Sequence, residues 1–182
     1  MEFRDLCATD IEVRVQSVKQ NGLVLLLYKN ARVDMAILDE TVGAENWQRE
    51  HYECKGNLFC RVGIRCKMND KPDAQFFEYE WIWKSDCGVE SNTEAQKGEA
   101  SDSFKRACFN WGIGRELYTT PFLWISSDKC KIQSNNKGGY VCYDKFAVEK
   151  IKIENKKITG LSIINSQTRE RVFVMLPETK GE

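Results

Sequence analysis

The chain has 182 residues and a mass of 21.1 kDa, a size that suits one domain, or one domain with a small appended subdomain. Hydrophobic residues make up 42% and charged residues 30%, a balance that excludes global disorder because a packed core can form. Lys and Arg together number 27, as do Asp and Glu, and this zero net charge argues against a protein that coats duplex DNA by its total charge. The net charge is compatible with a local basic groove whose charge is offset by acidic residues elsewhere in the chain.

The N-terminal residues MEFRDLCATD carry charges where a secretory signal needs an apolar run. The longest aliphatic run, residues 23–28, is too short to cross a membrane. We therefore expect a cytosolic chain whose eight cysteines are reduced thiols. None of these cysteines forms a C-x-x-C pair and the single histidine, His51, has no evident ligand partner, so we expect no metal site.

The first half of the chain alternates strand and helix patterns. Residues 9–28 predict one or two strands that turn around Asn21-Gly22. Asn30 can cap a helix, ARVDMAILDETV, which Gly43 ends. Three strand-like segments follow, ENWQREHYECK, LFCRVGIRCKM and QFFEYEWIWK, with a turn at Gly56-Asn57 and another within 69–73.

The second of these three segments separates apolar residues from cations. Every second residue from Leu58 to Met68 is apolar, and these residues should face the core. The opposite face presents Arg61, Arg65 and Lys67, which we call the basic comb. Two interpretations stay open: the comb binds an anionic ligand, or it pairs across the sheet with Glu78 and Glu80 of the next strand. The aromatic residues of that next strand are expected in the core or in a subunit interface: Phe77, Tyr79, Trp81 and Trp83.

A long helix is predicted next. Thr93 and Gln96 form a capping-box pattern, and Gly112 ends the helix. Its apolar stripe, spaced as on a helix, consists of Ala100, Phe104, Ala107, Cys108 and Trp111. Three cations lie off that stripe: Lys97, Lys105 and Arg106. Beyond it, residues 126–139 predict a polar loop, and residues 140–182 a small antiparallel meander of three strands.

Two separated motifs, NARVDMAILDETVGAENWQREH and EAQKGEASDSFKRACFNWGIGRELY, resemble the Rad52-type single-strand annealing proteins, including the short versions carried by bacteriophages. The resemblance covers roughly residues 25–125. It implies an α+β fold in which a three-stranded antiparallel sheet packs on a long helix, a β-β-β-α core. We accordingly expect an annealing core in residues 1–125, the polar loop 126–139 and a β-rich extension in 140–182.

The resemblance also implies a function. Its members form rings or arcs, bind single-stranded DNA in a basic groove and anneal complementary strands in recombination and repair, without nucleotide hydrolysis, metal or other cofactor. By this likeness Lys105 and Arg106 contact phosphates, Arg32 assists them, and the basic comb and Lys97 complete the candidate DNA-binding set. Eukaryotic members carry a further cation where this chain has Phe109. The expected partners are single-stranded DNA, further copies of the chain and a single-strand binding protein, in a bacterial host cytoplasm.

Three other functions remain as alternatives: a module that protects single strands without annealing them, a metal-dependent nuclease, and a scaffold without nucleic acid. The nuclease is disfavoured because the carboxylates form no tight set with a nearby lysine, so we expect no enzyme. The protecting module would use the same cations. An annealing protein and a protecting module differ in their effect on the rate of strand pairing, which the first raises and the second lowers.

Overall fold

The computed structural model of the protein describes residues 1–68, 78–89 and 95–177. The fold is α+β, mostly antiparallel strands with two α-helices among the described residues, as the sequence predicts. The chain divides into two compact units. The first comprises residues 1–4 and 30–114, and the second comprises residues 5–29 and the chain from 115 onward. The predicted annealing core, 1–125, takes in the first unit and part of the second, and its functional boundary stays a prediction.

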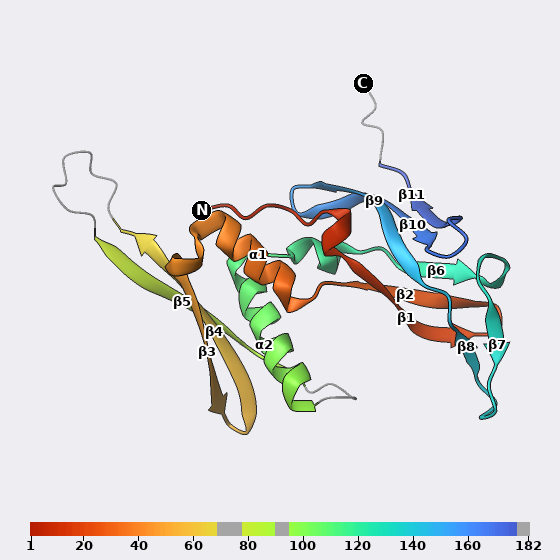
Figure 1. Ribbon diagram of the computed structural model, residues 1–182, viewed down its shortest axis with the longest axis horizontal. Coiled ribbons are helices and arrows are strands. Elements are labelled where there is room, and N and C mark those ends of the chain that lie inside the picture. The colour runs from red at the N-terminus through yellow and green to blue at the C-terminus, as the bar shows by residue number, and fades with distance from the viewer. Residues whose placement is uncertain (69–77, 90–94, 178–182) are drawn as a thin grey trace. The chain divides into compact units, whose positions relative to one another are not determined.

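The first unit contains two helices and one sheet (Figure 1). Its elements are α1 (Ala31–Val42), the short 3-10 helix η2 (Ala44–Asn46), β3 (Trp47–Cys54), β4 (Asn57–Lys67), β5 (Tyr79–Cys87) and α2 (Ala95–Trp111). The strands are antiparallel in the order β3-β4-β5, and α2 packs on β4 and β5.

Local signals place the ends of these elements. The side chain of Asn30 accepts a hydrogen bond from the backbone N–H of Arg32, and Gly43 ends α1 with φ 85°, so both predictions are confirmed. The β3–β4 turn is Lys55-Gly56, one residue earlier than predicted. Both residues have positive φ, 52° and 74°, as a type I′ hairpin turn requires. The predicted capping box at Thr93 lies outside the described residues.

The C-terminus of α2 is a Schellman motif. Gly112 has φ 105°, its N–H donates to the carbonyl of Phe109, and the N–H of Ile113 donates to the carbonyl of Cys108. The backbone of Gly112 thus turns the chain away from the helix and satisfies two carbonyls that would otherwise lack intrahelical partners.

The core of the first unit lies between the sheet and α2. Cys60, Val62 and Ile64 of β4 are fully buried, which confirms the predicted alternation. On α2 the fully buried side chains include Phe104, Ala107 and Cys108. The indole N–H of Trp111 donates to the carbonyl of Val62 over 3.0 Å and fixes the helix against the middle strand.

The second unit contains a six-stranded antiparallel sheet in the order β11-β10-β9-β1-β2-β6. Its strands are β1 (Glu12–Lys19), β2 (Gly22–Tyr28), β6 (Leu123–Ser126), β9 (Phe146–Glu154), β10 (Lys157–Asn165) and β11 (Arg171–Met175). A separate two-stranded sheet pairs β7 (Ile132–Ser134) with β8 (Tyr140–Cys142). Three 3-10 helices complete the unit: η1 (Ala8–Asp10), η3 (Arg115–Thr119) and η4 (Ser127–Lys129).

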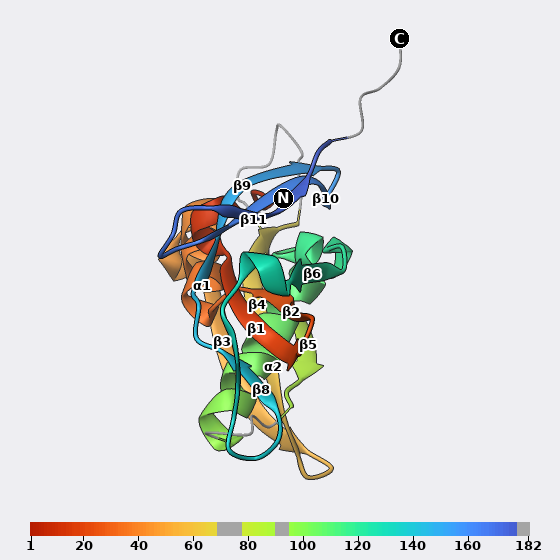
Figure 2. The same cartoon turned by 90° about the vertical axis from the view of Figure 1, so that its right-hand side faces the viewer.

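The three C-terminal strands lie side by side, as predicted for the meander (Figure 2). They do not form a sheet of their own, because β9 also pairs with β1 through Ala147 and Glu12. The predicted loop 126–139 contains η4 and β7. The sequence pattern missed these two elements because each has only three residues, too few to show a period.

Candidate nucleic-acid interface

The sheet of the first unit has two different faces. Its inner face carries the buried residues of β4 and is covered by α2. The other face, which we call the outer face, carries Arg61, Gly63 and Arg65 of β4, with Tyr79, Trp81 and Trp83 of β5 beside them. Tyr79 is 47% and Trp81 39% exposed. The prediction that these aromatic residues lie in the core is therefore wrong for Tyr79 and Trp81, whereas a role in a subunit interface stays a prediction.

Guanidinium groups stack on the aromatic rings of the outer face. The Cζ of Arg61 lies 4.5 Å from the ring centroid of Trp83, and the Cζ of Arg65 lies 4.3 Å from that of Tyr79. Trp83 in turn lies over Gly63, directly opposite it in the ladder, where a β-carbon would come within 2.8 Å of the ring. The stacking limits how far the arginines can move, so part of their ordering cost is met before any ligand binds.

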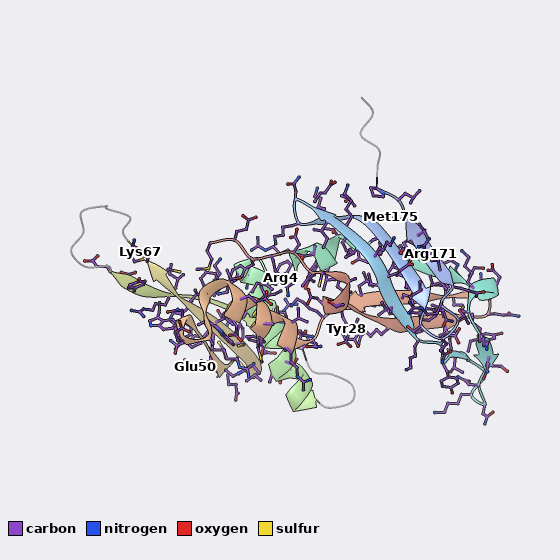
Figure 3. The ribbon with its side chains drawn as sticks, turned by 45° about the horizontal axis from the view of Figure 1, so that its top comes forward. Arg4, Tyr28, Glu50, Lys67, Arg171 and Met175 are labelled. Atoms are coloured by element: carbon purple, nitrogen blue, oxygen red, sulfur yellow. The ribbon has the colours of Figure 1, made fainter. Side chains whose placement is uncertain are left out.

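The alternative interpretation of the comb was a salt network between β4 and β5. The ion pair that the structure shows for Arg61 joins β4 to β3 instead. Glu80 is opposite Cys66 in the ladder, on the inner-face side, so it does not share the face of the arginines. Arg61 instead pairs with Glu50 of β3, to which its Nε and terminal nitrogen donate over 3.0 and 2.6 Å. Figure 3 shows Glu50 on this sheet and Lys67 at the end of β4. The sequence missed Glu50 because the strand pairing, not the spacing along one strand, brings it to Arg61.

Lys105 and Arg106 lie in the middle of α2, half-buried, on the side of the sheet opposite the comb. The Nε of Arg106 is 3.3 Å from Oδ1 of Asp86 on β5. Successive helical residues project about 100° apart, so Lys105 points around the helix away from that contact. The structure therefore brings neither residue onto the outer face with Arg61 and Arg65.

The remaining candidates are spread over the first unit. Arg32 is exposed in the first turn of α1. Lys67 is exposed at the end of β4, and Lys97 is in the first turn of α2 with its side chain outside the described residues. Two cations outside the predicted set lie on the inner-face side: Arg49 stacks on Phe104 at 4.9 Å, and Lys84 stacks on Trp111 at 4.5 Å. Arg49 is exposed on β3, and the alternation of that strand would have indicated it as a further candidate cation.

Within residues 1–68, 78–89 and 95–177, no group of three or more His, Cys, Asp or Glu side chains is arranged to hold a metal ion. Burial raises the pKa of the Cys60 thiol to about 11, so this sulfur stays protonated near neutral pH and serves as core packing. In the same described ranges, no helix combines the length and apolar character needed to cross a membrane.

The first unit thus presents cations on both a helix and an open sheet face, and a buried core holds these elements in place. These are the properties of a protein that binds a polyanion through the phosphate backbone of that polyanion. The family model of the Rad52/22 double-strand break repair proteins matches residues 4–137. The chain belongs to this family, which places it in DNA repair and recombination. No curated protein and no solved structure matches the chain.

Proposed function

We propose that this protein binds single-stranded DNA and anneals complementary strands without nucleotide hydrolysis, as a homo-oligomeric ring or arc. The observation that carries the proposal is the presence of cations on both sides of one sheet in a chain of the Rad52/22 family: Lys105 and Arg106 on α2, and on the outer face two guanidinium groups that stack on aromatic rings. Such groups grip phosphates without reading sequence. Annealing needs that property, because base edges must stay available to the second strand.

The β3–β5 sheet and α2 are the β-β-β-α core of this proposal. Lys105 and Arg106 make the main phosphate contacts, a mobile ammonium beside a planar donor fork. Arg32 and Lys97 extend this contact along the two helices. The basic comb, Arg61, Arg65 and Lys67, makes a second and weaker set of contacts on the outer face. Because the two sets lie on opposite sides of the sheet, each can be removed without altering the other.

The test is the rate at which two complementary labelled oligonucleotides pair, measured by energy transfer in EDTA and without nucleotide. We expect faster pairing than in buffer alone. We also expect the logarithm of the affinity for single strands to fall linearly as the logarithm of the salt concentration rises. Slower pairing would indicate a protecting module instead, and cleavage that appears when magnesium is added would indicate a nuclease. Light scattering and negative-stain images of the same samples report the ring or arc.

A further inference from the structure

The second unit carries a groove of about 390 Å³ on the meander of β9, β10 and β11. Its apolar side chains are aliphatic and come from the end of β11 and the residues after it: Val174, Leu176 and Pro177. Ile151, Leu161 and Met175 also border the groove, but they pair with one another at the alternate ladder positions, so their side chains point to the opposite face of the sheet. Val174 is 52% and Leu176 78% exposed, so these side chains remain in water in the isolated chain. Figure 3 labels Arg171 and Met175, the two ends of β11. A groove of this size and lining fits two or three apolar side chains of a ligand.

Cations surround this aliphatic lining. Lys150, Lys152 and Arg171 all line the groove. Lys150 lies directly opposite Ser162 on β10, and Val174 lies opposite the same serine on β11, so an ammonium and an apolar side chain flank one position. Two acids already pair with this rim: Glu149 accepts both hydrogen bonds of Arg171, and Glu154 is 3.0 Å from Lys152.

The charge of the meander differs from that of the whole chain. Residues 146–175 contain six Lys and Arg and three Glu, a net charge of +3, whereas the whole chain has a net charge of zero. This excess favours an anionic ligand. The described lining contains no aromatic ring on which a base could stack, and aliphatic side chains favour a ligand that is itself partly apolar.

We propose that this groove binds a short acidic peptide segment of a partner protein, with apolar side chains on the aliphatic lining and carboxylates at Lys150 and Lys152. The whole groove lies beyond residue 137, where the family match ends. The apolar side chains supply affinity by leaving water, and the lysines select acidic sequences over neutral ones.

The experiment selects a random dodecapeptide display library on the full chain and measures the enriched peptides by fluorescence anisotropy. The groove variant is Lys150→Glu with Lys152→Glu, and the matched control is Lys145→Glu with Lys157→Glu, exposed lysines that do not line the groove. We expect enrichment of peptides that combine Asp or Glu with Leu, Ile or Phe. Their affinity should fall at least tenfold in the groove variant and less than twofold in the control.

A third variant, Val174→Asp, tests the apolar part of the groove and should lose the same peptides at least tenfold. Circular dichroism of each variant verifies that it is folded. Enrichment of neutral or basic peptides, or equal binding to the groove variant, overturns the proposal. The proposal is also overturned if the groove variant loses binding to oligothymidylate and keeps binding to peptide, because the site then binds nucleic acid. A change of oligomeric state without peptide selection also overturns it, in favour of an interface between copies.

Discussion

Arg106 of α2 and Asp86 of β5 form an ion pair, with Nε 3.3 Å from Oδ1. Asp86 also accepts a hydrogen bond from the side-chain amide of Asn110, one turn further along α2. The carboxylate therefore holds, in the absence of DNA, the guanidinium that we propose as a phosphate ligand. A phosphate that binds Arg106 would have to compete with Asp86, so we expect this ion pair to weaken the proposed DNA contact.

Removing the competing charge should strengthen DNA binding. In Asp86→Asn the amide keeps the size of the side chain and loses its charge, so Arg106 is freer to bind phosphate. A partly exposed ion pair is worth about 1 kcal/mol or less, so the dissociation constant for oligothymidylate should fall by a factor of about two to five. Fluorescence anisotropy at fixed salt measures the change.

The control for that change is Glu50→Gln, which frees Arg61 on the outer face in the same way. If α2 makes the main contact, Glu50→Gln should have the smaller effect. Weaker binding by Asp86→Asn would show that Asp86 positions Arg106 for the strand instead of competing with it.

The double variant Lys105→Ala with Arg106→Ala should bind single strands at least tenfold more weakly while the oligomer persists. Each phosphate contact on a single strand contributes about 0.7 to the slope of log affinity against log salt, so the loss of two contacts should lower that slope by about 1.4. Titrations at three salt concentrations measure the slope, and light scattering follows the oligomer. Unchanged affinity at physiological salt would remove α2 from the DNA site.

Charge reversal on the comb should have a smaller effect. Arg61→Glu places a carboxylate beside Glu50 and removes the cation that stacks on Trp83. We expect binding to weaken by less than tenfold, with Lys157→Glu, the same charge change in the second unit, as control. Dissociation of the oligomer by Arg61→Glu alone would instead assign the outer face to a subunit interface.

The sequence predicted those features that depend on neighbours along the chain. The inward face of β4, the Asn30 cap and the glycine ends of both helices all follow from local spacing or from one residue's conformational preference. The pairing of Arg61 with Glu50 and of Arg106 with Asp86 could not be predicted in this way. Those contacts depend on strand register, and a shift of one residue would move every side chain to the other face.

Strand register also explains why Glu80 of β5 does not share a face with the comb. Glu80 and the comb were expected to share a face, but the β4–β5 register puts Arg65 opposite Trp81 and Cys66 opposite Glu80. The pattern within each strand does not determine this register, because alternation along one strand does not say which residue of the neighbouring strand lies opposite. The joining of β1 and β9 into one sheet is likewise a contact between distant segments that no local pattern encodes.

Acid should destabilise the meander through Glu149. Hydrogen bonds from Arg171 and then Ser162 lower the pKa of this carboxyl to about 2 in the folded protein. In the unfolded chain the pKa of a glutamate is about 4.3, so the stabilisation by the Glu149 carboxylate is complete above that pH and is lost as the pH falls toward 2. Glu149→Gln lacks this titration, and its melting temperature should fall less steeply between pH 5 and pH 2. Parallel acid profiles for the two proteins would contradict the assignment.

Gly63 is expected to tolerate no side chain while Trp83 lies over it. A β-carbon at Gly63 would come 2.8–2.9 Å from three atoms of the indole, so Gly63→Ala has to displace the ring on which Arg61 stacks. Overpacking of this kind costs about 1–3 kcal/mol, even though alanine is the better strand former. Urea unfolding measures the loss in the free energy of unfolding. In the background of Trp83→Leu the clash is absent, and the same substitution should then be neutral or stabilising. Equal destabilisation in both backgrounds would mean that the indole is not what excludes a side chain at Gly63.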